Sequence, residues 1–175
     1  MTQGVYAVTQ EHKVALRGRL LAARSALRAP ERAAGDARRD AALAGLLAGA
    51  RVAAYTSFGT EPSTAALVTA TTLLPVLRPD RDLDWAFPDG PPLGVDAVAG
   101  CDVVLVPALA VDRRGVRLGR GGGSYDRALP RARGLLVAML HDGELVEELP
   151  AEPHDVPVHA VATPGGLVHL RRLEH

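Results

Sequence analysis

Short apolar runs without alternating polar residues constrain the fold of this chain more than any other feature. The clearest run spans residues 102–107, and the segments 135–140 and 158–162 are of the same kind. Strands that are apolar on both sides are typical of a mostly parallel sheet covered on both faces. Helical segments separate these runs, as expected for such a sheet. The chain is therefore expected to belong to the α/β class.

Two helices are expected in the first 50 residues. In the first, leucines and alanines recur at the spacing of one helical face, whereas the arginines lie largely elsewhere around the axis. The second covers residues 33–48, and Pro30 stands where a helix can begin, because its missing N–H is harmless in a first turn. Weaker helices are expected over residues 64–73, where threonines lower helix propensity, and over residues 125–133, which Pro130 can shorten.

The remaining strands and loops predict where a ligand would bind. Further strands are expected at residues 51–56, 74–77 and 83–87, and a long glycine-rich loop at residues 111–124. In open α/β sheets, ligands bind beyond the carboxyl ends of the strands. The segments of interest are therefore the loops that follow Tyr55, Pro107, Leu140 and Ala162.

Length, charge and cysteine content narrow the functional class. The chain has 175 residues, enough for a single domain over residues 1–172, and residues 173–175 resemble the start of a purification tag. Its 20 basic and 20 acidic residues argue against a non-specific nucleic-acid partner. No apolar run approaches about 18 residues, so no membrane span is expected. One cysteine and no signal-peptide pattern predict a cytoplasmic protein without disulfides.

The strongest local signal is the glycine-rich segment 117–127. Gly119 and the glycines at 121–123 allow backbone N–H groups to approach a ligand closely, and successive N–H groups can form an anion-binding nest. The segment leads into a helix and carries three arginines, which suit phosphate or carboxylate. The sequence predicts a phosphate-binding loop, with a flexible surface loop as the alternative. Neither a Walker A pattern nor a dinucleotide fingerprint fits, since Ser124 replaces the last glycine of the latter.

These residues also carry a resemblance to a known family. The stretch Val106-Pro-Ala-Leu-Ala-Val-Asp112, followed by Gly115-x-Arg117-Leu-Gly-x-Gly-x-Gly-x-Tyr-Asp126, resembles the signature of the 5-formyltetrahydrofolate cyclo-ligases. The similarity extends through most of the chain. It includes Lys13-x-x-x-Arg17, the loop acid Glu61 and the turn His154-Asp155-Val-Pro.

The resemblance implies a fold and a reaction. Members have a single three-layer α/β/α domain, with a mostly parallel, Rossmann-like central sheet. They use ATP as co-substrate and Mg²⁺ to close 5-formyltetrahydrofolate to 5,10-methenyltetrahydrofolate. ATP phosphorylates the formyl oxygen, N10 of the folate attacks the activated carbon, and phosphate departs. The implied partners are therefore this folate and ATP, with neither nucleic acid nor membrane, and a monomer is expected.

The resemblance also implies an ATP site. Lys13, Arg120 and Tyr125 would be catalytic, and Lys13 would contact the phosphates with help from Arg17. Lys13 is the only lysine beside 19 arginines, which fits a role that a compact ammonium fills best. It is expected on an exposed helix face, and a merely solvated residue is the alternative. The rest of the ATP site would be the loop residues Arg117, Leu118, Gly119, Arg120, Gly121, Gly122, Gly123, Ser124 and Tyr125.

Metal and folate sites follow from the same resemblance. Asp126 and Asp155 would hold Mg²⁺, which prefers oxygen ligands; a first-turn acid and a turn residue are the respective alternatives. Glu61 would accept hydrogen bonds from the pterin, unless it is a solvated loop acid. Thr56 would also contact the folate. The loop residues Arg120, Gly121, Gly122, Gly123 and Ser124 would face it as well.

Three departures from the family pattern fall on the folate side. Ser124 stands where a tyrosine is usual, Gly122 where some members carry lysine, and the segment 88–99 is short. Two alternatives therefore stay open. One is a non-catalytic nucleotide-binding domain, and the other is a different ATP-dependent ligase or kinase on the same scaffold.

Overall fold

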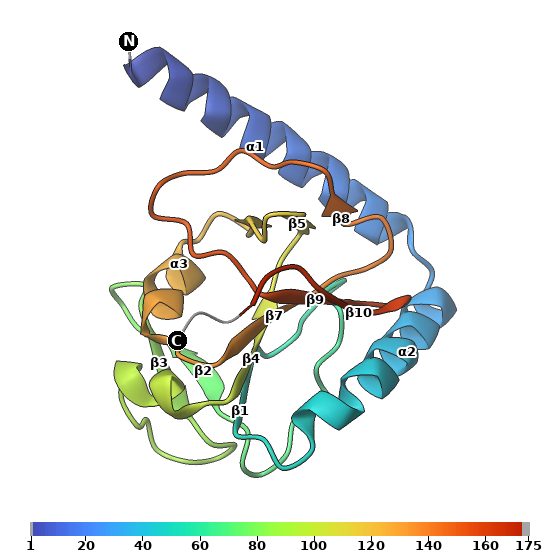
Figure 1. The fold of residues 1–175 in the computed structure, drawn as a ribbon, viewed down its shortest axis with the longest axis vertical. Helices are drawn as coiled ribbons and strands as arrows, with labels where there is room; N and C mark the ends of the chain where they lie inside the picture. Colours follow the sequence, from blue (N-terminus) through green and yellow to red (C-terminus); the bar gives the residue numbers. More distant parts are fainter. Residues whose placement is uncertain (1, 173–175) are drawn as a thin grey trace.

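A mostly parallel sheet forms the centre of the molecule (Figure 1). The computed structural model describes residues 2–172, and side chains from residue 10 onward. Within this part of the chain the sheet has five strands in the order β1-β4-β7-β9-β10. The first four pair in parallel, and the last returns antiparallel at the edge. The strands are β1 (Val52–Ala54), β4 (Val103–Pro107), β7 (Leu135–Met139), β9 (Ala160–Thr163) and β10 (Gly166–His169).

Helix α2 (Ala29–Leu47) covers one face of this sheet and packs on β9 and β10. Leu43 from the helix and Leu105, Val137 and Met139 from the strands have no exposed surface. These side chains form one half of the core. The expected α/β class with a mostly parallel sheet is confirmed, because both faces of β4 and β7 are buried.

Shorter elements cover the opposite face. They include a hairpin of β2 (Leu74–Leu77) and β3 (Leu83–Ala86). The others are η1 (Val95–Gly100), α3 (Ser124–Ala128) and η2 (Leu129–Arg131). Trp85, Val104 and Leu136 lie at the centre of this second half of the core. The preceding segment 88–94 is rich in proline and glycine, which disfavour helical backbone, so no longer helix precedes η1.

Helix α1 (Thr2–Ala26) packs on a second, small sheet (Figure 1). That sheet has the order β6-β5-β8, formed by β6 (Arg117–Leu118), β5 (Ala110–Asp112) and β8 (Leu145–Val146). The expected continuous loop over 111–124 is thus partly an antiparallel β5–β6 ladder. The buried Asp112 carboxylate stabilises it by accepting from the backbone N–H groups of Arg114, Val116 and Leu149 at 2.9–3.0 Å.

Other expectations need correction. Residues 64–73 form turns and not a helix, because threonine hydroxyls bond the local backbone instead. Thr72 Oγ1 accepts from Thr69 N at 2.9 Å, and Thr69 Oγ1 accepts from Thr71 N at 3.3 Å. The helix expected over 125–133 is divided into α3 and η2, with Pro130 in the second. The proposed tag at 173–175 lies outside the described residues.

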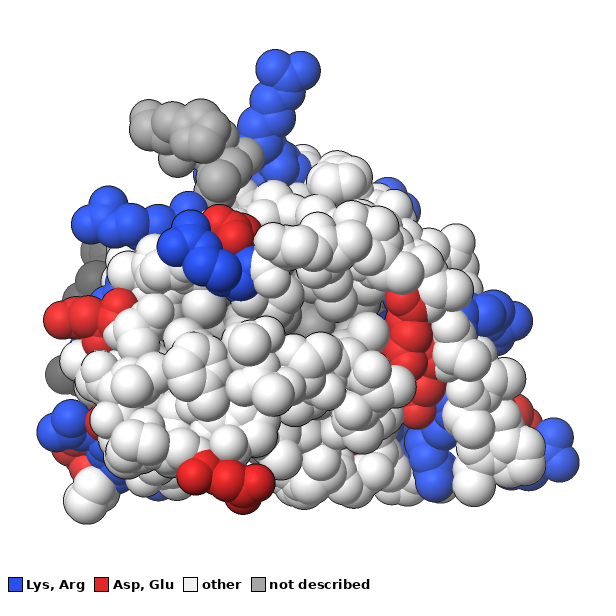
Figure 2. Space-filling view, turned by 90° about the horizontal axis from the view of Figure 1, so that it is seen from below, with Lys and Arg blue, Asp and Glu red and all other residues white. Residues whose placement is uncertain are grey.

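Charged side chains are distributed unevenly over the surface. The face seen from below the view of Figure 1 is largely uncharged, with basic and acidic side chains mostly toward its margins (Figure 2). The cavity beyond the ends of β1 and β4, by contrast, is lined by many charged groups. Among the described helices, none has the length and apolarity needed to traverse a membrane.

Candidate active site

A cavity of about 350 Å³ lies where the loops after β1 and β4 meet helix α1. Fourteen of the fifteen site residues expected from the sequence line it. Thr56 is the exception, since it is exposed and lies outside the lining. The lining includes Lys13, Arg17, Glu61, Arg117, Leu118, Gly119, Arg120, Gly121, Gly122, Gly123, Ser124, Tyr125, Asp126 and Asp155.

Left-handed backbone shapes the glycine-rich loop. Gly121 has φ 100° and Gly123 has φ 78°, conformations that favour glycine. Arginines hold the loop through its carbonyl groups. Arg17 Nε donates to Gly119 O at 2.8 Å, and Arg81 Nε donates to Gly122 O at 3.0 Å. The loop is therefore ordered against α1 on one side and the β2–β3 turn on the other.

Arg117 anchors the loop to the end of β4. Its guanidinium donates to Pro107 O at 3.0 Å and to Asp126 Oδ1 at 3.1 Å, and lies 5.8 Å from the ring centre of Tyr125. Burial lowers the pKa of Arg117 below its ordinary value, although the neighbouring Asp126 carboxylate opposes this effect. Asp126 thus has a protein partner besides any metal it would hold.

The Tyr125 hydroxyl is buried and finds no hydrogen-bond partner among the described side chains and backbone. Burial raises the pKa of this phenol above its ordinary value, so it remains protonated at neutral pH. Buried polar atoms in folded proteins are nearly always paired. A hydroxyl of this kind in a cavity wall is a donor that a ligand can satisfy.

Lys13 is buried, which corrects the expectation of an exposed helix face. The residue is 8% exposed, and its Nζ lies 3.2 Å from Glu152 Oε2. Gln10 Nε2 donates to the other oxygen of Glu152 at 3.0 Å. The segment around Glu152 packs against α1, so the alternative of a merely solvated lysine is wrong.

Glu61 joins the loop after β1 to the glycine-rich loop. Its side chain is 6% exposed, so the alternative of a solvated loop acid is wrong. One carboxylate oxygen lies 3.4 Å from Arg120 Nε, and the other accepts from Phe58 N at 3.0 Å. The Arg120 guanidinium also lies 4.9 Å from the centre of the exposed Phe58 ring.

Acidic groups at the far side of the cavity fit a hard cation. Ligand atoms of Glu152, His154 and Asp155 lie within 4.8 Å of one another. Asp155 Oδ2 accepts from Glu152 N at 2.7 Å, and Asp126 lines the same cavity. Carboxylate oxygens are the ligands that Mg²⁺ prefers, so the Glu152 and Asp155 carboxylates suit the expected ion, whereas the His154 imidazole does not.

Three further residues line the cavity without having been predicted as site residues: Gln10, Arg24 and Glu152. Arg24 is 2% exposed and pairs with Glu144, with its Nε at 2.8 Å from one oxygen. A usable signal was the spacing of Lys13, Arg17 and Arg24. Steps of four and seven residues place all three on one helical face.

Comparison with known proteins identifies relatives over most of the chain. The family model for the 5-formyltetrahydrofolate cyclo-ligase family matches residues 86–164. A 5-formyltetrahydrofolate cyclo-ligase of Mycolicibacterium smegmatis is 42% identical over 159 residues, covering 74% of this chain and 82% of the relative. The Escherichia coli K12 cyclo-ligase is 47% identical over 66 residues, which is 36% of either chain.

Solved structures agree with this. The 5,10-methenyltetrahydrofolate synthetase of Aquifex aeolicus superimposes with a TM-score of 0.76 at 26% identity, covering 93% of this chain and 96% of that one. The synthetase from Mycoplasma pneumoniae, at 20% identity and a TM-score of 0.74, shares the fold over 87% of this chain and 98% of its own. With the long match to the mycolicibacterial protein, the resemblance seen in the motifs is confirmed, and this chain belongs to the 5-formyltetrahydrofolate cyclo-ligase family.

Proposed function

We propose that this protein closes 5-formyltetrahydrofolate to 5,10-methenyltetrahydrofolate, using Mg-ATP and releasing ADP and phosphate. The observation that carries the proposal is the shared cavity. The glycine-rich loop and Glu61 line the same cavity and are linked through Arg120. Such a cavity would hold a phosphate donor beside a second substrate.

The two substrates would occupy different parts of the cavity. ATP phosphates would lie on the glycine-rich loop, near Lys13 and Arg17. The pterin would lie at Glu61, whose carboxylate can accept hydrogen bonds from neighbouring ring N–H groups. Ser124 offers the folate less stacking area than a tyrosine, so polar contacts carry more of its recognition.

The chemistry requires activation, because an amide oxygen is a poor leaving group. The formyl oxygen attacks the γ-phosphorus of ATP, and the bond to the β-phosphate oxygen breaks to release ADP. N10 then attacks the activated carbon and loses its proton, and the C–O bond breaks to release phosphate. Protein groups chiefly position the substrates and neutralise charge in such transfers.

Residues of the chain supply these effects. The Lys13 ammonium and the Arg120 guanidinium face the cavity and would neutralise the transferring phosphoryl group. The protonated Tyr125 hydroxyl, which lacks a partner among the described residues, would donate to a substrate oxygen. Asp126 and Asp155 would hold Mg²⁺, which reduces the negative charge of the phosphates when it is bound.

A direct assay tests the proposal. The protein is mixed with 5-formyltetrahydrofolate and Mg-ATP, and the absorbance of the methenyl product is followed, with omission of ATP as the control. We expect product only when all components are present. ATP binding without product would favour a non-catalytic nucleotide-binding domain. Turnover of ATP with another acceptor would favour a different ligase or kinase. Monomeric state and cytoplasmic location remain predictions from the sequence, and light scattering after gel filtration measures the former.

A further inference from the structure

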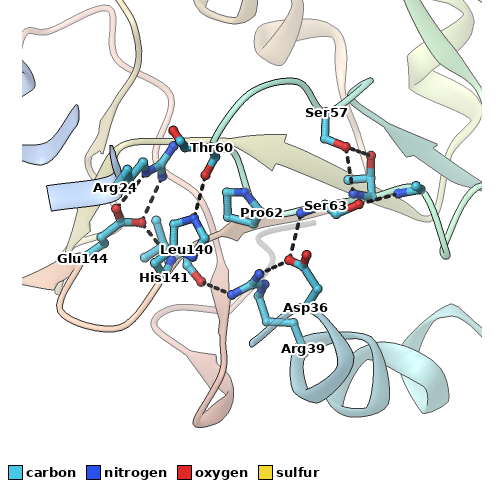
Figure 3. Close-up of polar contacts among 12 residues, drawn as sticks. Arg24, Asp36, Arg39, Ser57, Thr60, Pro62, Ser63, Leu140, His141 and Glu144 are labelled. Carbon is cyan, nitrogen blue, oxygen red and sulfur yellow. Dashed lines mark hydrogen bonds and ion pairs between the residues drawn. The ribbon is translucent and has the colours of Figure 1, made fainter. Parts of the chain in front are cut away.

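Polar side chains form hydrogen bonds with the backbone of the loop that carries Glu61 (Figure 3). His141 Nε2 lies 2.8 Å from Thr60 O, directly before Glu61. After Glu61, Tyr55 Oη donates to Pro62 O at 2.5 Å, and Ser63 N donates to Asp36 Oδ1 at 3.0 Å. Backbone groups on both sides of the folate-binding carboxylate are thus fixed by side chains that do not line the cavity.

His141 is itself held in a chain of contacts that begins on α1. The residue follows β7 and is 5% exposed. Its backbone N–H donates to Glu144 Oε1 at 2.7 Å. Arg24 donates to both oxygens of Glu144, at 2.8 and 2.9 Å, and to Ala108 O at 2.6 Å. The helix that carries Lys13 and Arg17 is thereby connected to the loop that carries Glu61.

A second buried arginine stabilises the same region from α2. Arg39 has no exposed surface, and its guanidinium donates to Leu140 O at 3.0 Å, one residue before His141. It also pairs with Asp36, whose carboxylate accepts from Ser63 N. Figure 3 shows Arg24 and Arg39 approaching this strand end from different helices.

The contact between His141 and Thr60 has a defined direction. A carbonyl oxygen only accepts, so Nε2 must carry the proton and donate. Burial lowers the pKa of the imidazole, so the neutral form prevails at neutral pH. Removing such a buried donor leaves the Thr60 carbonyl without this partner, and the adjacent Glu61 loses a constraint on its position.

We propose that His141 is a positioning residue for folate recognition, which fixes Glu61 through the Thr60 carbonyl and is itself held by Glu144 and Arg24. The inference rests on the proposed role of Glu61 in the cyclo-ligase reaction. His141 lies outside the cavity lining and so contacts neither substrate. Its effect therefore belongs to the folate site and should disappear when Glu61 no longer contributes.

Steady-state kinetics test this role with matched variants. His141→Ala should raise KM for the folate about fivefold or more and leave KM for ATP within about twofold. His141→Gln, whose amide N–H lies near the position of Nε2, should restore most of the affinity. The control is His159→Ala at the opposite end of β7, where Nδ1 accepts from Leu136 N at 2.9 Å. This control should change neither constant.

A double-mutant cycle distinguishes positioning from general destabilisation. In the Glu61→Gln background, His141→Ala should change KM for the folate by less than about twofold, because contacting or coupled residues are not additive. Full additivity, or equal effects on both substrates, would overturn the proposal while leaving the cyclo-ligase function intact.

Hydrogen exchange provides a readout that does not depend on activity. Amides of residues 56–64 should exchange faster in His141→Ala than in the wild type or in His159→Ala, with β4 unchanged. If His141→Ala does not fold, His141→Asn takes its place, since its shorter amide does not reach Thr60. Unchanged exchange in this segment would overturn the proposal. Absence of turnover in the wild type would instead refute the proposed function.

Discussion

Lys13 is paired with Glu152 in the cavity wall, and this explains why a single lysine is kept apart from solvent. We expect Lys13→Met, which keeps the aliphatic stem, to raise KM for ATP about tenfold or more, because an ammonium beside the phosphates is lost. Lys13→Arg keeps the charge but not its compact shape, so it should recover only part of the affinity. Normal ATP kinetics in a folded Lys13→Met protein would contradict the assignment.

Glu61 is the proposed folate contact in the same cavity. Loss of one partner from a buried polar contact costs about 1–3 kcal/mol. Glu61→Gln should therefore weaken folate binding about tenfold, since about 1.4 kcal/mol corresponds to a factor of ten. ATP affinity should change little. Calorimetry with each ligand separately measures both effects.

Ser124→Tyr provides the complementary variant. The added ring should tighten folate binding if the loop accommodates it, because it restores stacking area. If Glu61→Gln weakened ATP as much as the folate, the division of the cavity would be wrong.

Among the strands and helices, close backbone packing where a strand begins restricts which residue can occupy that position. A Cβ atom on Gly134, just before β7, would lie 2.3 Å from Cys101 O and 2.5 Å from Asp102 O. Gly134→Ala must therefore displace backbone beside β4, and we expect a loss of about 1–3 kcal/mol or more in the free energy of unfolding.

The control for this prediction is Gly45→Ala in α2, where a Cβ atom meets nothing within 4 Å. Alanine is favoured over glycine inside a helix by about 1 kcal/mol, so this variant should be neutral or more stable. Thermal or denaturant unfolding measures both. Equal stability of the two variants would show that the Gly134 contact is not limiting.

Patterns of apolar residues predicted four of the five strands of the central sheet, because buried parallel strands leave a clear signal, as at 103–107 and 135–139. The edge strand β10 and the strands of the small sheet were not predicted. The edge strand β10 is half exposed, and β8 has two residues. The helix expected at 64–73 does not form, because local threonine hydrogen bonds compete with helical ones.

In the candidate site, too, some features were predictable from local sequence patterns and others were not. The presence in the cavity lining of the loop glycines and arginines, and of Lys13, Glu61 and both aspartates, was predictable from spacing and resemblance. Glu152 and the contacts of Arg24 were not, because they depend on how the segment after β8 folds back on α1. Ion pairs between residues more than 100 positions apart, such as Arg24 with Glu144, leave no local pattern in the sequence.

For the whole molecule, the buried polar groups predict how stability depends on pH. Burial lowers the pKa of His141 below its ordinary value of 6.5. The charges of Arg24 and Arg39 lower this pKa further, whereas the Thr60 carbonyl and the Glu144 carboxylate oppose the shift. Below pH 6.5, His141 therefore takes up a proton more readily in the unfolded chain than in the folded protein. Stability should therefore fall as the pH falls below 6.5.

His141→Gln should flatten this part of the pH profile, because glutamine does not titrate. Denaturant unfolding of both proteins across this range, compared at each pH, isolates the contribution of His141 from that of the acidic groups. An unchanged slope would show that the buried imidazole does not contribute to the pH dependence.

The proposed reaction transfers a phosphoryl group from ATP to the formyl oxygen of the folate within this cavity. The most direct test uses 5-formyltetrahydrofolate with heavy oxygen in the formyl group, turned over with unlabelled Mg-ATP in ordinary water. Mass analysis of the released phosphate then follows the label. We predict one labelled oxygen in each phosphate and one phosphate for each methenyl product. Unlabelled phosphate beside a full yield of product, or no product at all, would contradict the account.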